Sequence, residues 1–555
     1  MELIHHLKPI QSKFENIQTQ YKNNRAVQRI WDGDHTLWKP DPDQIANRLG
    51  WLTVMEEMEN QITRLSTFRK TLLEEDIQDV ILLGMGGSSL GPEVLSRVFP
   101  NHPDGLKLSV LDSTHPSAVL ETAEAADIQK TLFLVATKSG GTVETLSFMK
   151  YFYRQVSNLV GDGKAGNHFA AVTDPGSKLV DLAQKFNFRE IFLNNQNIGG
   201  RYSVLSFFGL VPAAVLGLDL DRLLKSGQQA ANLSRPQVPL EENPGFLLGS
   251  ALSAAFLSGR NKLTLVSSPE LSSFPIWVEQ LIAESTGKEG RGILPVIEQR
   301  IYPPEYYGSD RLLVYISLGE NPAVSSQLQE LTNQGIPALE IRIRDRYQLG
   351  SLFFLWEFAT ALTGAGMGIN PFDQPNVESA KIQARNLVDS YRETGELPPS
   401  NQVPAEKSTL EDFISKNQVP GSYVALQAFL EPNQIYTNFL QQLKQNLQEK
   451  YQLPVTVGFG PRFLHSTGQL HKGDSGKGLF IQLLAAPDRD IGIPDEMTQD
   501  TTSLTFGTLL QAQALGDAAA LQEAGRSVLQ LSLREPIKTN LQELTLSFSE
   551  SASKE

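Results

Sequence analysis

The 555-residue chain contains no cysteine. It therefore has no disulfide, no thiolate metal site and no thiol nucleophile, and this composition suits the cytosol. Basic residues are outnumbered by acidic ones, and the net charge is −14. A chain of this charge lacks the basic surface that binds nucleic acid or anionic membranes. We therefore expect neither partner, and an anionic substrate would need a local cluster of donors.

Long apolar runs are also missing. The most apolar stretch, VLSFFGLVPAAVLGL at 204–218, is shorter than a membrane span and contains Pro212. It predicts a buried core helix. The first residues, MELIHHLKPI, lack the apolar region of a secretory signal peptide. These features together predict a cytoplasmic protein.

The order of apolar patterns predicts an α/β protein. Residues 1–75 have helix-period apolar positions and no strand run, which indicates an N-terminal helical segment. Over 76–235 and again over 236–392, short apolar runs alternate with helical stretches, the pattern of a parallel sheet flanked by helices. A polar, proline-bearing stretch then leads into a C-terminal α/β section at 393–555, where Ser408 and Glu411 have capping-box spacing.

The strand-like runs occur in three groups along the chain. They lie at 79–87, 106–113, 131–141, 168–177 and 190–194, at 261–268, 310–319 and 336–343, and at 422–430, 453–460 and 478–486.

The first strand-like run ends in a glycine-rich loop. Gly84 and Gly86 begin a dinucleotide fingerprint, but Ser89 stands where the third glycine would permit close helix packing. No Gly-Lys-Ser/Thr follows, which excludes a Walker loop. Backbone N–H groups and hydroxyls around Gly87 and Ser88 can hold an anion, or can simply form a capped turn.

A second loop of similar chemistry follows the third run. It contains Thr137, Lys138, Ser139 and Thr142 with two glycines, and a helix is predicted to begin near Thr142. Hydroxyl and N–H groups coordinate a phosphate monoester without a large positive field. Two such loops at one carboxyl edge of a sheet indicate a single ligand, and the alternative is another capped turn.

Three further motifs accompany the loops: GGRYSVLSFFGL at 199–210, EQLIAESTGK at 279–288 and NPFDQPNVESAK at 370–381. The loops resemble the sugar isomerase (SIS) domain, and the whole set resembles the glucose-6-phosphate isomerase family. The C-terminal section is most similar to the isomerase half of fused transaldolase–isomerase proteins. The resemblance implies two SIS domains, reversible isomerisation of glucose 6-phosphate and fructose 6-phosphate in glycolysis and gluconeogenesis, no metal or other cofactor, and a homodimer.

The chemistry of aldose–ketose isomerisation determines which groups the site needs. Moving a proton between C2 and C1 through an enediolate requires a carboxylate base, a cation near the developing oxyanion and a grip on the phosphate. The resemblance implies that Glu284 is the base, that Arg201 faces the enediolate and that Lys381 assists at the ring oxygen. A structural ion pair and a surface lysine are the alternatives for the last two. Glu284 and Lys288 could also form a routine i, i+4 helix pair, although Gly287 would end the helix between them.

The resemblance also implies the substrate contacts. These are Gly87, Ser88, Thr137, Lys138, Ser139 and Thr142 around the phosphate, together with Gln280 and Gln374.

The family's ring-opening histidine is missing from its usual place, because the chain has no histidine between His168 and His465. The segment HSTGQLHKGD at 465–474 closely resembles the loop around that histidine. We therefore assign ring opening to His465, with His471 as the second choice and a capping or hydrogen-bonding role as the alternative. In much of the family this histidine reaches into the neighbouring subunit's site, which implies shared sites.

Other functions compete with isomerisation. A non-catalytic sugar-phosphate sensor would keep both loops but would not need Glu284, Arg201 and Lys381 together. A related isomerase, such as one for mannose 6-phosphate, would use the same chemistry. An NAD-dependent oxidoreductase would use Asp112 for the ribose, and Ser89 disfavours it.

Overall fold

The computed structural model describes residues 1–100 and 102–552. The first sheet has the order β3-β2-β4-β5-β6 and all of its strands are parallel. Its strands are β2 (Asp79–Gly84), β3 (Lys107–Leu111), β4 (Thr131–Ala136), β5 (Phe169–Thr173) and β6 (Glu190–Leu193).

Both faces of this sheet are buried, which explains its continuous apolar strands. Val80 and Leu82 pack into one core while Ile81 and Leu83 pack into another, as alternation along a strand requires. The α/β class with parallel sheets flanked by helices is therefore confirmed.

The second sheet has the order β1-β10-β9-β7-β8. Its strands are β7 (Lys262–Ser267), β8 (Leu294–Ile297), β9 (Arg311–Leu318), β10 (Ala338–Ile343) and β1 (Glu2–His6). β1 pairs antiparallel with β10 at the edge of this sheet. The prediction of an entirely helical N-terminal segment is therefore wrong for residues 2–6, where a short strand, ELIHH, pairs along the sheet edge.

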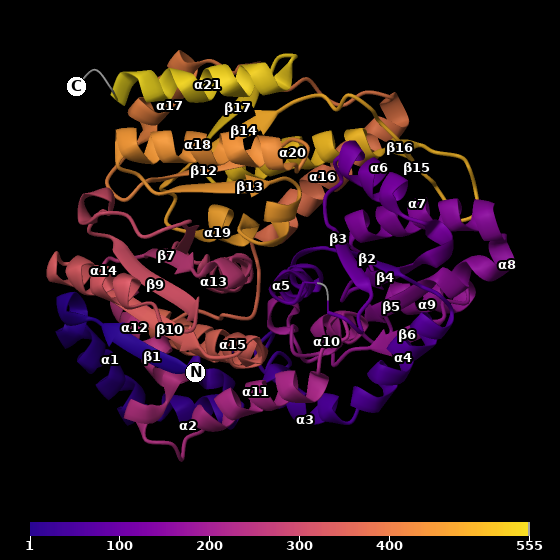
Figure 1. Cartoon of the computed structure of the whole chain (residues 1–555). Coiled ribbons are helices and arrows are strands. Elements are labelled where there is room, and N and C mark those ends of the chain that lie inside the picture. The colour runs from indigo at the N-terminus through magenta and orange to yellow at the C-terminus, as the bar shows by residue number, and fades with distance from the viewer. Residues whose placement is uncertain (101, 553–555) are drawn as a thin grey trace.

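The C-terminal section forms a third sheet, which lies above the other two units in Figure 1. Its order is β11-β17-β14-β12-β13, and all pairs are parallel. Its strands are β11 (Val403–Pro404), β12 (Tyr423–Phe429), β13 (Val455–Phe459), β14 (Gly478–Leu484) and β17 (Ser527–Ser532), and a small hairpin adds β15 (Gly492–Ile493) and β16 (Leu504–Thr505).

The three sheets have the same order of strands. When the edge strands β1 and β11 are left aside, the first strand of each unit lies between the second and the third, as β3-β2-β4-β5, β8-β7-β9-β10 and β13-β12-β14-β17 show. The sequence indicated two such units and an α/β section, whereas the structure contains three units of the same strand order.

Helices cover the sheets and join the units. In the first half of the chain they are α1 (Gln11–Asn23), α2 (Ala26–Trp31), α3 (Val54–Glu59), α4 (Ile62–Glu74), α5 (Leu90–Val98), α6 (Pro116–Ala125), α7 (Val143–Val160), α8 (Asp162–Ala165), α9 (Lys178–Lys185), α10 (Phe207–Val215), α11 (Leu220–Leu233), α12 (Pro244–Leu257) and α13 (Phe274–Thr286). In the second half they are α14 (Pro322–Asn333), α15 (Leu349–Met367), α16 (Val377–Thr394), α17 (Lys407–Asn417), α18 (Gln434–Tyr451), α19 (Gly468–Gly473), α20 (Phe506–Glu523) and α21 (Ile537–Ala552).

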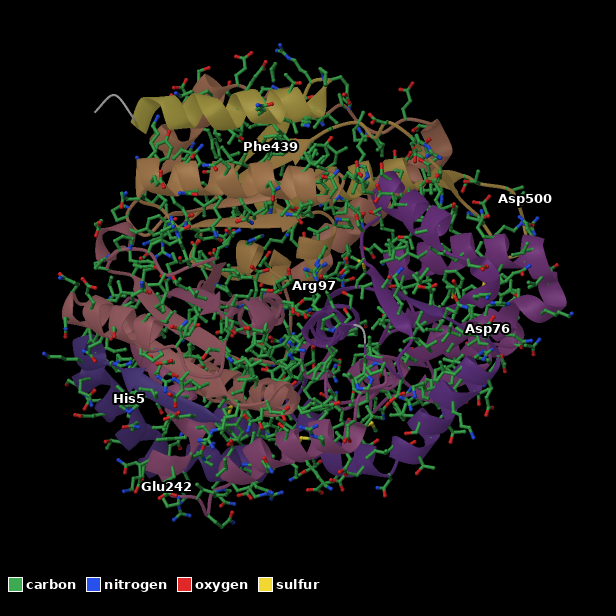
Figure 2. All side chains as sticks on the ribbon, in the orientation of Figure 1. His5, Asp76, Arg97, Glu242, Phe439 and Asp500 are labelled. Carbon is green, nitrogen blue, oxygen red and sulfur yellow. The ribbon has the colours of Figure 1, made fainter. Side chains whose placement is uncertain are left out.

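The predicted core helix is confirmed, since every residue of α10 is buried. Across the described parts of the chain, no helix has both the length and the apolar character needed to cross a membrane. The acidic side chains labelled in Figure 2, such as Asp76, Glu242 and Asp500, are exposed.

The capping box predicted at 408–411 is wrong. Helix α17 begins one residue earlier, at Lys407, and its N-cap Glu406 makes no side-chain capping bond. The third unit nevertheless packs firmly on the others, through α16 against α20 and α13 against α19.

Candidate functional site

The two hydroxyl-rich loops lie side by side at the carboxyl edge of the first sheet. β2 and β4 are adjacent and parallel, so the loops that follow them meet where the strand order reverses. Thr142 is the N-cap of α7, as the sequence predicts, and its Oγ1 lies 2.9 Å from Oγ1 of Thr137. The arrangement gathers hydroxyls and helix N–H groups at one point, which suits a phosphate.

The other loop residues differ in exposure. Ser88 is buried, whereas Ser139 is exposed. Lys138 forms an ion pair with Asp174, which follows β5, and its Nζ also donates to the carbonyl of Gln196 at 3.3 Å. The lysine charge is thus partly neutralised before any ligand arrives.

A glycine contact brings Arg201 to these loops. A Cβ on Gly87 would lie 2.2 Å from the carbonyl oxygen of Gly200, so the two backbones touch as only glycine allows. Arg201 follows directly and is buried, and its Nε donates to Ser285 Oγ at 2.8 Å. Its Nη2 donates to the carbonyl of Pro371 at 2.6 Å, so two separate segments of the chain hold the guanidinium.

Glu284 lies on α13 beside this arginine. Arg201 Nη1 is 3.7 Å from Glu284 Oε2, and both side chains are less than one-tenth exposed. Burial raises the pKa of Glu284 above its ordinary value, although Arg201 and other nearby cations oppose the shift. A carboxylate of raised pKa next to a buried cation is a suitable general base for a reaction that develops an oxyanion.

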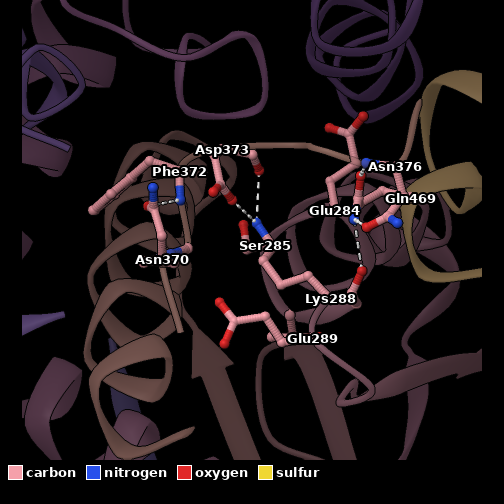
Figure 3. Close-up of polar contacts among 12 residues, drawn as sticks. Glu284, Ser285, Lys288, Glu289, Asn370, Phe372, Asp373, Asn376 and Gln469 are labelled. Carbon is pink, nitrogen blue, oxygen red and sulfur yellow. Dashed lines mark hydrogen bonds and ion pairs between the residues drawn. The ribbon is translucent and has the colours of Figure 1, made fainter. Parts of the chain in front are cut away.

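Lys288 does not form the helix pair that its spacing allows. Gly287 ends α13, and the Nζ of Lys288 donates to the backbone oxygen and to Oδ1 of Asp373, both at 2.6 Å (Figure 3). Burial lowers the pKa of Lys288 to about 8. Asp373 also accepts from Arg201 through its carbonyl, so this segment ties the arginine to the lysine.

The third unit delivers His465 to the same place. His465 Nε2 lies 2.8 Å from Oε1 of Glu144, on the first turn of α7, and its carbonyl accepts from Gln280 Nε2 at 2.8 Å. The loop docks against Gly86, where a Cβ would lie 2.7 Å from the His465 carbonyl oxygen.

Two further ion pairs fix this histidine loop. Arg462, three residues before His465, forms an ion pair with Glu93 and lies 3.3 Å from Oδ2 of Asp112. The acid that would contact a ribose in a dinucleotide enzyme is therefore occupied in holding the histidine loop.

His471 contacts β12 of the third sheet. It is buried on α19, its Nδ1 lies 3.3 Å from Gln427 Nε2, and burial holds its pKa well below the ordinary value. A neutral imidazole enclosed beneath the third sheet does not fit the ring-opening role, and the second choice is set aside.

Comparison with known proteins identifies the family. The family model described as "Phosphoglucose isomerase" matches residues 10–292, just over half of the chain. The chain belongs to the phosphoglucose isomerase family. A curated glucose-6-phosphate isomerase from Prochlorococcus marinus (strain NATL2A) is 29% identical over 395 residues, which cover 62% of this chain and 74% of the relative. One from Thermus thermophilus is 26% identical over 388 residues, covering 61% and 90%.

Solved structures agree on the fold. The crystal structure of a glucose-6-phosphate isomerase from Chlamydia trachomatis superimposes with a TM-score of 0.59 at 19% identity, over 73% of this chain and 89% of that one. A hypothetical protein from Thermus thermophilus gives the same TM-score at 24% identity, over 69% and 99%.

Two residues implied by the resemblance to phosphoglucose isomerases lie at the rim. Lys381 on α16 is 44% exposed and lies 4.0 Å from Glu378, and Gln374 is exposed just after Asp373. The charge of Lys381 is one of several nearby positive charges that oppose the rise in the pKa of Glu284 caused by burial.

The sequence did not indicate two residues that contact this cluster. Glu144 accepts from His465, and Gln513 on α20 donates from Nε2 to Oε1 of Glu144 at 2.7 Å. Glu144 could have been found, because it lies two residues after Thr142. No motif surrounds Gln513.

Proposed function

We propose that this member of the phosphoglucose isomerase family interconverts glucose 6-phosphate and fructose 6-phosphate, in glycolysis and gluconeogenesis. The observation that carries the proposal is the buried Glu284 carboxylate 3.7 Å from the buried Arg201 guanidinium, next to two hydroxyl-rich loops. This pair combines the base with the cation that the enediolate requires.

The phosphate would bind at the mouth of α7. Ser88, Thr137, Ser139 and Thr142 supply hydroxyls there, and the helix N-terminus adds N–H groups and a favourable dipole. Lys138 would contribute a charge that it shares with Asp174. Gly87, Gln280 and Gln374 are the remaining proposed substrate contacts.

Ring opening would be the work of His465, with Lys381 at the ring oxygen. His465 is 17% exposed, so its imidazole is reachable from the site, and Glu144 holds its Nε2. The other ring nitrogen, Nδ1, would take the proton of the anomeric hydroxyl or return it. Lys381, at the rim, would donate toward the ring oxygen as the ring opens.

Proton transfer would then pass through Glu284. The carboxylate removes the proton from C2 of the open aldose and returns it to C1, and the negative charge develops on the oxygens facing Arg201. A buried donor at a developing oxyanion contributes about 3–4 kcal/mol to barrier lowering in comparable enzymes.

All of these groups belong to one chain. The composition predicts a cytoplasmic protein and the resemblance implies a homodimer, and we retain both expectations. The His465–Glu144 contact, however, does not need a second subunit. A dimer of this protein would therefore contain two self-sufficient sites.

The test is turnover by the purified chain. Fructose 6-phosphate conversion to glucose 6-phosphate, measured without added metal by a coupled dehydrogenase assay, should be robust. Binding of fructose 6-phosphate without turnover would favour the sugar-phosphate sensor and contradict the proposal.

A further inference from the structure

Helix α20 of the third unit contributes one side chain, Gln513, that contacts Glu144. Gln513 is buried, and its Nε2 donates to Glu144 Oε1 at 2.7 Å, while its Oε1 accepts from Thr114 Oγ1 at 2.9 Å. Because the Glu144 carboxylate only accepts, the amide must turn its nitrogen toward it. The same oxygen, Oε1, also contacts Nε2 of His465 at 2.8 Å.

The same helix face holds the histidine loop one turn further on. Asp517 Oδ1 lies 2.5 Å from Nζ of Lys472 on α19, and both side chains are almost fully buried. Asp517 is also held by Gln482 of β14 at 3.1 Å. Gln513 and Asp517 are four residues apart and therefore lie on one face of α20. One rigid helix thus contacts both Glu144 and the segment that follows His465.

We propose that Gln513 is a positioning residue for ring opening: it fixes the Glu144 carboxylate against His465, and α20 sets the separation of the two. The proposal rests on the proposed isomerase function. It adds a group from the third unit that acts through Glu144 and does not touch the substrate.

The electrostatics of Glu144 agree with this role. Burial alone raises the pKa of Glu144, but the charge and hydrogen bond of His465, with a smaller effect of Lys381, hold it below its ordinary value. A buried carboxylate needs its lone pairs satisfied to stay ionised and immobile. Gln513 supplies the second donor, and His465 supplies the first.

The experiment compares two substrates. Gln513→Leu removes the donor at similar size. We expect kcat for fructose 6-phosphate to fall about 10–100-fold, part of the 10²–10⁴ that an acid–base group contributes. 5-Deoxyfructose 6-phosphate lacks the hydroxyl that closes the ring, so its conversion does not need the ring-opening acid–base group. Its rate, followed by NMR, should therefore change by less than about threefold. Equal losses on both substrates would overturn the proposal.

Gln448→Leu is the matched control. Gln448 is also a buried glutamine of the third unit, and its Nε2 donates to the buried Glu298 Oε1 at 2.7 Å. It lies outside the proposed site. We expect it to lower the melting temperature comparably while leaving the ratio of the two activities unchanged.

An isosteric variant adds a pH signature. In Gln513→Glu, a protonated carboxyl can donate to Glu144 as the amide does, whereas an ionised one repels it. The kcat of this variant relative to wild type should therefore be higher at pH 6 than at pH 9, and a ratio independent of pH would contradict the positioning role. This variant also carries the test if Gln513→Leu does not fold.

A readout without turnover separates this inference from the isomerase proposal. With ¹⁵N-histidine labelling, the His465 imidazole signals, assigned through His465→Ala, should shift in Gln513→Leu and stay fixed in Gln448→Leu. Unmoved signals in both would refute the positioning role. If wild type binds but does not turn over fructose 6-phosphate while the His465 signals still move, the isomerase proposal fails and the contact stands.

Discussion

At the scale of single residues, Glu284 has the two properties that a general base requires. It is buried, so its pKa is raised, and it lies 3.7 Å from a fixed cation. Its alternative role, a helix pair with Lys288, is wrong because Lys288 bonds to Asp373. The motif in the sequence predicted Glu284. The partner of Lys288 could not be predicted in this way, because Asp373 lies 85 positions away in the chain.

Glu284→Gln should lower kcat by about a thousandfold or more, because the amide cannot accept the C2 proton. The affinity for fructose 6-phosphate, measured by calorimetry, should change only a few-fold. Glu289→Gln is the control, since Glu289 is exposed and pairs with Lys39 on the surface. Turnover that survives Glu284→Gln would remove this residue as the base.

The raised pKa of Glu284 also predicts the pH dependence. The base must be ionised, so activity falls as the pH drops through its pKa, which burial places above the ordinary 4.5. The measurement is kcat for 5-deoxyfructose 6-phosphate against pH, because this substrate does not need ring opening. If kcat falls only at or below pH 4.5, burial does not raise the pKa of Glu284.

At the scale of elements, the site depends on turns at the carboxyl ends of strands. The apolar runs of β2 and β4 and the loops after them were predicted, because a buried parallel strand followed by a glycine-containing loop is visible in sequence alone. β1 was missed, since ELIHH is a short, half-polar edge strand. The contact between His465 and Glu144 joins positions 321 residues apart, which only the tertiary fold determines.

The contact between the first loop and the arginine turn can be tested by Gly87→Ala. The added Cβ would lie 2.2 Å from the Gly200 carbonyl oxygen, so the turn carrying Arg201 must move. We expect a loss of about 1–3 kcal/mol in the free energy of unfolding from overpacking. The accompanying fall in kcat should be about 100-fold, as for a misplacement of about 1 Å.

Gly163→Ala is the control for this substitution. Gly163 lies in α8, outside the site, and a Cβ there would meet nothing within 4 Å. It should keep full activity and gain stability slightly, since alanine suits a helix better than glycine. Equal behaviour of the two variants in urea unfolding and turnover would contradict the close contact at Gly87.

At the scale of the whole molecule, three units of one strand order build one site. In the proposed site, the first unit supplies the phosphate loops and Arg201, the second supplies Glu284, and the third supplies His465. The sequence predicted two units of this strand order and did not indicate that the C-terminal section is a third. The histidine loop of this section resembles the family, but its strands carry no family motif. We propose that a single chain places Arg201, Glu284 and His465 around one substrate.

The most direct test is complementation between two variants of the site. Glu284→Gln and His465→Ala, with different affinity tags, are co-expressed, mixed species are purified through both tags, and fructose 6-phosphate turnover is measured. If each site is built from one chain, the mixed species should show no activity above the mean of the two variants. If the histidine acted in a neighbouring subunit, each mixed dimer would hold one intact site, and about half of wild-type activity would return. Such recovery would show that His465 acts in the neighbouring subunit's site and would contradict a site built from one chain.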